Sequence, residues 1–93
     1  MAEVHHHTIF FSGRVQGVGY RNWMVDHARA LGISGWVRNR SDGTVEAVLQ
    51  GAAEAVAQLA ERAHRGPRAA WVEQVVVEAA EGRYEGFLAT ETA

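Results

Sequence analysis

Cysteine and lysine are both missing from the 93-residue sequence. The absence of cysteine excludes disulfides, thiolate metal ligands and a cysteine nucleophile. All nine basic residues are arginine, so the chain has no Walker lysine, Schiff-base lysine or lysine general base. Binding of a phosphate group would therefore fall to arginine side chains and backbone amides.

Long apolar runs are also absent, since no stretch approaches the ~20 residues that cross a bilayer. Residues 1–8 include three histidines but no apolar segment typical of a secretory signal. We therefore expect a cytoplasmic protein with no membrane partner. The net charge of −2 argues against broad attraction to nucleic acid, so any anion site must be local. The length fits one compact domain, residues 1–93, and we expect it to be a monomer.

Metal ligands are few and scattered. The two aspartates, Asp26 and Asp42, stand far apart in the sequence, and neither belongs to a paired-carboxylate motif. The run His5-His6-His7 is a candidate, but neighbouring residues on a strand point to opposite faces, and we expect this run to lie in a mobile terminus. The sequence predicts no metal and no cofactor. His27 and His64 are expected at the surface.

Hydrophobic periodicity predicts seven elements. Residues 7–15 alternate as in a strand, with Ile9, Phe11 and Val15 on one face. The other expected elements are a helix over 21–31, a short strand that opens at Trp36 and Val37, and a strand over 44–50 after the Asp42-Gly43 turn. A helix over 52–65, a strand over 72–78 and a weaker strand over 84–89 should follow. The second helix should end at Gly66-Pro67.

This order, βαββαβ with a short fifth terminal strand, is typical of an α+β fold. Each helix has one apolar stripe and the strands alternate, so both helices should pack on one face of an antiparallel or mixed sheet. The predicted assignment is a ferredoxin-like sandwich. In so small a domain Trp23, Trp36 and Trp71 are expected to pack in the core or at an edge.

The glycine-rich segment from Arg14 to Tyr20 lies between a strand and a helix start. Unpaired N–H groups and the positive end of the helix dipole favour an anion there, and Gly17 and Gly19 allow successive amides to turn inward. Arg21 at the helix start opposes the dipole by ~0.3–1 kcal/mol, and a bound dianion would reverse that penalty. A purely structural turn beside a solvated arginine is the alternative interpretation.

Asn39 lies where the second strand enters its turn. Asparagine at such a place usually serves turn geometry. A functional role, accepting a hydrogen bond from a water beside Arg21, requires the end of the hairpin to lie next to the glycine-rich segment.

Two segments resemble the signatures of the acylphosphatase family in order and spacing: Gly13-Arg-Val-Gln-Gly-Val-Gly-Tyr-Arg21 and Gly35-Trp-Val-Arg-Asn-Arg-Ser-Asp-Gly-Thr-Val-Glu46. Gly66-Pro67, Ala70, Val72 and Phe87 extend the similarity over nearly the whole chain. The resemblance implies hydrolysis of acyl phosphates to a carboxylate and inorganic phosphate, with broad tolerance of the acyl group.

The resemblance also implies residue roles. Arg21 would bind the substrate phosphate, and Asn39 would orient the attacking water. The backbone of a phosphate-binding loop would carry over to Arg14, Val15, Gln16, Gly17, Val18, Gly19 and Tyr20. Tyr20 replaces a more usual phenylalanine, and we expect its hydroxyl to lie near the phosphate and affect product release.

An acyl phosphate is a suitable substrate for a chain that lacks lysine, cysteine and a paired-carboxylate motif. Its leaving carboxylate has a conjugate acid of pKa ~4, so no general acid is needed. The alternative hypothesis is a non-catalytic ferredoxin-like module that binds an anion or RNA. An RNA-binding sheet should show exposed aromatic residues on its central strands with basic charge around them, and we expect the central strands to lack a matching set.

Overall fold

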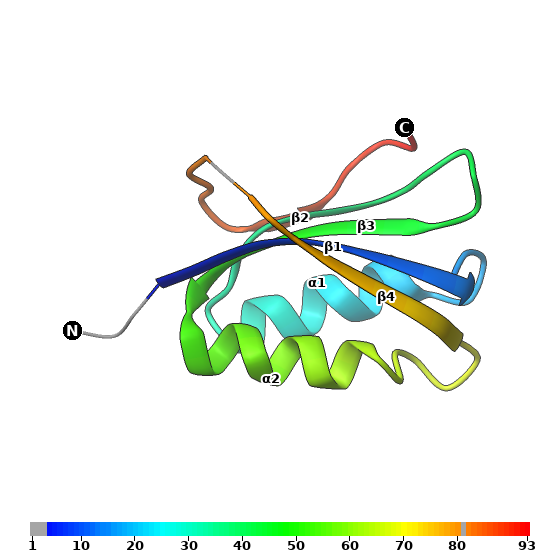
Figure 1. Ribbon diagram of the computed structural model, residues 1–93, viewed down its shortest axis with the longest axis horizontal. Coiled ribbons are helices and arrows are strands. Elements are labelled where there is room, and N and C mark those ends of the chain that lie inside the picture. Colours follow the sequence, from blue (N-terminus) through cyan, green and yellow to red (C-terminus); the bar gives the residue numbers. More distant parts are fainter. Residues whose placement is uncertain (1–3, 81) are drawn as a thin grey trace.

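The computed structural model describes residues 4–80 and 82–93. Its element order confirms the predicted βαββαβ succession with a short terminal strand (Figure 1). The elements are β1 (Val4–Arg14), α1 (Tyr20–Ala30), β2 (Ser34–Asn39), β3 (Val45–Ala52), α2 (Ala53–Ala63), β4 (Trp71–Ala79) and β5 (Phe87–Ala89).

The strands form one mixed sheet in the order β4-β1-β3-β2-β5. Only the β2–β5 pair is parallel, and the other pairs are antiparallel. Both helices cover the same face of the sheet, as Figure 1 shows. The predicted ferredoxin-like sandwich with two helices on one face is therefore confirmed.

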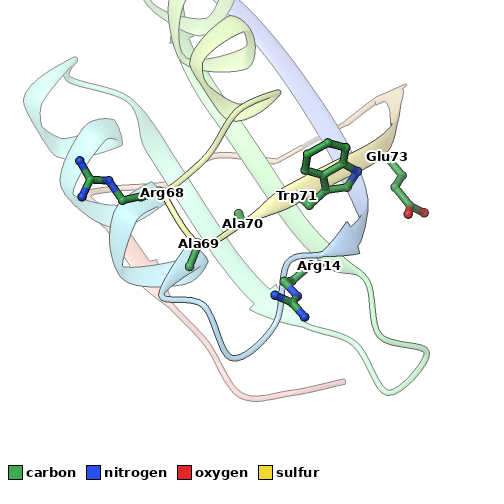
Figure 2. A pocket seen from close by; sticks show the side chains of 6 residues that line it. All are labelled: Arg14, Arg68, Ala69, Ala70, Trp71 and Glu73. Atoms are coloured by element: carbon green, nitrogen blue, oxygen red, sulfur yellow. The ribbon is translucent and has the colours of Figure 1, made fainter.

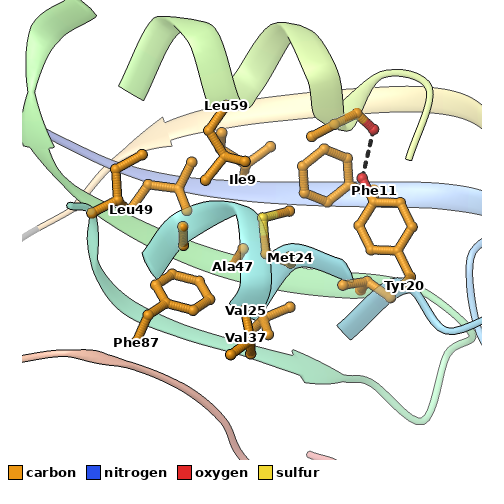
Figure 3. Packing of buried hydrophobic residues seen from close by; sticks show 14 of the residues in the cluster. Ile9, Phe11, Tyr20, Met24, Val25, Val37, Ala47, Leu49, Leu59 and Phe87 are labelled. Atoms are coloured by element: carbon orange, nitrogen blue, oxygen red, sulfur yellow. Dashed lines mark hydrogen bonds between the residues drawn. The ribbon is translucent and has the colours of Figure 1, made fainter. Parts of the chain in front are cut away.

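The core lies between the sheet and the helices (Figure 3). Because alternate side chains of a strand point to one face, Ile9 and Phe11 of β1 are buried there. They meet the apolar stripes of the helices, which include Met24 of α1 and Leu59 of α2. The buried stripes fix where α1 begins relative to the end of β1, and this position determines the geometry of the site described below.

The first strand begins earlier than predicted. His6 pairs with Gln50 of β3, and His7 pairs with both Leu49 and Ala79. The expectation that the histidine run lies in a mobile terminus is wrong, because β3 and β4 extend far enough to hydrogen-bond this part of the chain. Within residues 4–80 and 82–93, no three histidine or acidic side chains form a group that could hold a metal ion.

The three tryptophans differ in exposure. Trp23 packs beside the core, with its ring 4.2 Å from the His27 ring, and His27 lies half-buried at the surface. Trp36 is half-buried on the open face of the sheet. Trp71 lies at an edge of the sheet, on β4, as one of the two expectations had it, but it is 70% exposed there and not packed. His64 is exposed as predicted.

The fifth strand is shorter than predicted and begins at Phe87 instead of residue 84. Before it, Tyr84 N–H donates to the side chain of Gln50, and Gly86 C=O accepts from Gly35 N–H. The helices are 11 residues each, and in the described part of the chain none is long and apolar enough to span a membrane.

Candidate active site

A small hollow lies where the end of β1, the start of α1 and the end of β2 meet. Its volume is about 100 Å³, which suits a group the size of phosphate. The lining residues are Val15, Gly17, Gly19, Tyr20, Arg21, Asn22 and Asn39.

The loop from β1 to α1 turns its backbone toward this hollow. Gly17 and Gly19 have φ angles of 73° and 80°, in the left-handed region that side chains other than glycine rarely adopt. Gly19 is also the N-cap of α1, and no side chain caps the helix there. The first N–H groups of α1 therefore remain available to an anion.

Arg21 provides the positive charge of the hollow. It lies in the first turn of α1, which contains no acidic residue. Its half-buried side chain has no ion pair or hydrogen bond with any residue that the structure describes. A cation held beside the positive end of a helix dipole with no protein partner favours a bound anion.

Gln16 connects the loop to the β2–β3 hairpin. Its side-chain amide donates to Arg40 C=O at 2.8 Å and to Thr44 C=O at 2.9 Å. Both carbonyls belong to the turn that follows Asn39. The condition for a functional Asn39 is therefore met, because the end of the hairpin lies beside the loop and Asn39 lines the same hollow as Arg21.

The C-terminal residue Ala93 forms hydrogen bonds with the main chain on either side of Arg40. Ala93 N–H donates to Asn39 C=O at 3.0 Å, and Ser41 N–H donates to Ala93 C=O at 2.8 Å. Asn39 also pairs with Val45 of β3. The main chain at Asn39 is thus held on both sides, an arrangement that the weak pattern of the tail did not reveal.

The charged residues near Asn39 are engaged elsewhere. The Glu46 carboxylate lies 2.8 Å from Arg38 and 3.1 Å from Arg40. Asp42 accepts hydrogen bonds from the Thr44 hydroxyl and N–H, which lower the pKa of the Asp42 carboxyl. Neither carboxylate lines the hollow.

The Tyr20 hydroxyl points away from the expected phosphate position. It donates to the Ala63 carbonyl at the end of α2, with an O···O distance of 2.5 Å (Figure 3). The ring is 1% exposed and packs against Phe11 and Trp23. Burial raises the pKa of the Tyr20 hydroxyl. The expectation that this hydroxyl lies near the phosphate is wrong, because the hydroxyl joins the two helices.

The predicted loop residues do not all reach the hollow. Val15, Gly17, Gly19, Tyr20 and Arg21 line it, whereas Val18 packs beside the core. Arg14 lines a neighbouring, larger cavity instead. Asn22 lines the hollow but was not predicted, and its only sequence signal is a polar side chain next to Arg21 in the first helical turn.

The comparisons with known proteins show the family of the chain. The family model described as Acylphosphatase matches residues 7–88. An acylphosphatase of Rhodopseudomonas palustris is 56% identical over 78% of this chain and 74% of its own length. An acylphosphatase of Acidovorax sp. is 57% identical over 86% of this chain and 84% of its own length. The solved structure of an acylphosphatase from Coxiella burnetii has a TM-score of 0.89 at 33% identity, covering 94% of this chain and 93% of that one. The chain therefore belongs to the acylphosphatase family and is a hydrolase of acyl phosphates.

Proposed function

We propose that the chain hydrolyses acyl phosphates without a metal ion, using a water that Asn39 positions while Arg21 and loop N–H groups hold the phosphate. The observation that carries this proposal is the single hollow that Arg21, Asn39 and the two loop glycines line together. Phosphate held there would have a cation, the start of a helix and a neutral amide around it.

Arg21 has the geometry to bind the phosphate dianion. A guanidinium donates two parallel hydrogen bonds to two phosphate oxygens, and the α1 N–H groups approach from the loop side. The same charges stabilise the negative charge on the phosphoryl oxygens in the transition state. The lining residues include no carboxylate or imidazole to serve as a metal ligand.

The reaction balances without an acid or base from the protein. The water oxygen forms a bond to phosphorus as the bond from phosphorus to the acyl oxygen breaks, and the carboxylate leaves with the electron pair. A carboxylate needs no protonation to leave. Since Tyr20 and Arg21 are the titratable residues of the lining, and neither is suited to take a proton, we propose that a phosphate oxygen of the substrate accepts the water proton.

The RNA-binding alternative has less support. The open face of the sheet does carry two aromatic residues, Phe10 and Trp36, which the sequence analysis did not expect. Arg40 lies over Phe10 at 5.5 Å, Arg38 lies over Trp36 at 4.6 Å, and both arginines pair with Glu46. The rings and their cations are thus already engaged with each other. We propose a cytoplasmic monomer with no nucleic-acid partner.

The test is hydrolysis of benzoyl phosphate by the purified chain. We expect turnover well above the spontaneous rate, competitive inhibition by inorganic phosphate, and loss of turnover in Arg21→Ala. The matched control is Arg62→Ala, an exposed arginine on α2 whose side chain forms a hydrogen bond with His27. A folded wild-type chain that leaves benzoyl phosphate at its spontaneous rate would refute the proposal.

A further inference from the structure

Glu46 is the only buried charged residue in the part of the chain that the structure describes, with 7% of its surface exposed. It lies on β3, directly opposite Arg38 of β2 in the sheet register. Burial of a carboxylate costs free energy unless the charge is paired and hydrogen-bonded. The partners of Glu46 therefore indicate what its burial achieves.

The Glu46 carboxylate binds both residues that flank Asn39 in the sequence. Its Oε1 accepts hydrogen bonds from Arg38 Nε at 2.8 Å and from Arg40 Nη1 at 3.1 Å. Arg38 Nη2 lies 2.8 Å from the same oxygen. One carboxylate thus holds the side chains before and after Asn39 on the open face of the sheet.

Asn39 faces the other side of the sheet. Neighbouring residues of a strand alternate between the two faces, and Val37, two residues before Asn39, is buried in the core beneath the helices. Asn39 pairs with Val45 of β3, which is buried in the same core. Asn39 therefore lines the hollow while both of its neighbours are bound on the opposite face.

The position of Asn39 at the end of a strand makes such a clamp useful. β2 ends at Asn39, and residues 41–43 form an exposed turn. Terminal residues of an element open more easily than central ones. Main-chain hydrogen bonds hold the backbone there, including Arg40 N–H to Thr44 C=O at 2.9 Å. Side chains bound on the open face also resist rotation of the strand about its axis, which would turn the Asn39 amide away from the hollow.

The clamp is also connected to the loop from β1 to α1. The carbonyl oxygen of Arg40 accepts a hydrogen bond from the Gln16 side chain at 2.8 Å, and the guanidinium group of Arg40 binds Glu46. A continuous series of contacts therefore runs from the buried carboxylate to the loop that would hold the phosphate.

Two arginines near the other end of the loop are not held in this way. Figure 2 shows that the side chains of Arg14 and Arg68 point in different directions and away from the Glu73 carboxylate. Neither arginine forms an ion pair with a residue in 4–80 or 82–93. Paired arginines are thus a feature of the hairpin that carries Asn39.

We propose that Glu46 is a positioning residue for the hydrolysis, which fixes the direction of the Asn39 side chain by binding Arg38 and Arg40 together. A buried ion pair adds little net stability over apolar residues of similar shape, so the main contribution of Glu46 is to geometry. Glu46 does not line the hollow and contacts no reacting atom. The inference rests on the proposed function, in which Asn39 positions the attacking water.

The first test is the kinetics of Glu46→Ala with benzoyl phosphate. Its kcat should fall about tenfold, because the water is positioned less accurately. Its inhibition constant for inorganic phosphate should stay within about twofold of wild type, since Arg21 and the loop bind the phosphate. Glu46→Gln should lose less, because its amide oxygen still accepts a hydrogen bond from Arg38. The matched control is Glu78→Ala, an exposed carboxylate on β4, which should have wild-type kcat.

The second test combines Glu46→Ala with Asn39→Ala. If Glu46 acts through Asn39, the double variant should have the kcat of Asn39→Ala within about twofold, whereas independent effects would lower it about tenfold further. A further loss of that size would overturn the proposal, as would wild-type kcat in Glu46→Ala. Tighter phosphate binding in Glu46→Ala would also overturn it, because Glu46 would then restrain Arg40 from entering the hollow.

A further variant separates geometry from stability, and it replaces Glu46→Ala if that protein does not fold. Arg38→Leu/Glu46→Leu puts an apolar cross-strand pair in place of the ion pair, which should preserve the stability of the sheet. Urea unfolding checks this. The double variant should nevertheless have a lowered kcat, because Arg40 has lost the carboxylate. Wild-type kcat in this variant would show that the pair serves only to fill space.

Nuclear magnetic resonance gives a readout that does not depend on turnover. The side-chain NH₂ signals of Asn39, identified by their loss in Asn39→Ala, should form one sharp pair in wild type and in Glu78→Ala. They should broaden or split in Glu46→Ala, because the amide then exchanges between orientations. An unchanged sharp pair in Glu46→Ala would overturn the proposal. If wild type instead leaves benzoyl phosphate at its spontaneous rate, the proposed function is refuted, and these signals still decide whether Glu46 holds Asn39.

Discussion

Arg21 and Asn39 line one hollow from different elements, so replacing each should cause a different defect. Arg21→Ala should lose both phosphate binding and turnover, because the hollow then has no cation. Arg21→Lys should also be poor, since an ammonium group does not reproduce the planar donor fork. Competitive inhibition by inorganic phosphate measures the affinity of each variant for phosphate. Wild-type phosphate affinity in Arg21→Ala would show that the cation has been assigned wrongly.

Asn39→Ala should keep most of its phosphate affinity while kcat falls by about 10²-fold or more, because the water loses its positioning group. Asn39→Asp is the companion variant, and its added negative charge should weaken phosphate binding as well. Circular dichroism and thermal melts must accompany the kinetics, since Asn39 also borders the hairpin turn. Near wild-type turnover in folded Asn39→Ala would remove its proposed role.

Tyr20 gives a prediction about alkaline stability. Tyrosine is the only residue type in this lysine- and cysteine-free chain with an ordinary pKa near ~10. Burial raises the pKa of Tyr20 in the folded state, so its neutral form stabilises the fold below pH ~10, and this contribution is lost as the pH rises further.

Tyr20→Phe should therefore flatten the fall of unfolding free energy above pH ~10, where one buried tyrosine contributes up to ~1.4 kcal/mol per pH unit. At pH 8 the same variant should be less stable by about 1 kcal/mol, because the Ala63 carbonyl loses its donor. Urea unfolding across this pH range measures both effects. Parallel pH profiles for the two proteins would contradict the assignment.

The sequence was sufficient to find residues whose signal is local. Arg21 and Asn39 stand in two specific segments, and both line the hollow. The exposure of Trp71 and the position of Asn22 in the lining were not predicted, because both depend on which partner the strand or helix meets. At Trp71 the pairing of β1 and β4 shifts by one residue between Ser12 and Gly13, and no local pattern predicts such a bulge.

Between elements, the Gln16 side chain is the contact that joins the phosphate loop to the hairpin carrying Asn39. Gln16→Ala should lower kcat about tenfold, because the distance between the loop and Asn39 is no longer fixed, with a loss of stability of about 1 kcal/mol. Gln58→Ala, at an exposed position on α2, is the matched control. If both variants have wild-type kcat, the loop and hairpin are positioned by other contacts.

Element boundaries show where periodicity stops being informative. The helices were predicted to within about two residues, since each has a 3.6-residue apolar repeat and a glycine beyond its end. Strand limits depend on pairing. β1 starts at Val4 because Ala52 of β3 is opposite it, and β5 starts at Phe87 opposite Gly35. The layer arrangement followed from element order, whereas register required the tertiary structure.

For the molecule as a whole, the proposed mechanism assigns neutralisation of the phosphate charge to arginine and backbone N–H groups, so exhaustive chelation should leave turnover intact. The measurement is benzoyl phosphate hydrolysis before and after treatment with EDTA, with metal content determined in parallel. A preparation that loses most of its turnover and regains it with magnesium would show that the chemistry has been assigned wrongly.

The most direct test of the proposed mechanism is hydrolysis of benzoyl phosphate by the chelator-treated chain in water enriched in oxygen-18, with mass analysis of both products. Attack of a positioned water on phosphorus predicts one labelled oxygen in each phosphate and none in benzoate. Label in benzoate would show attack on the carbonyl carbon and would contradict the account.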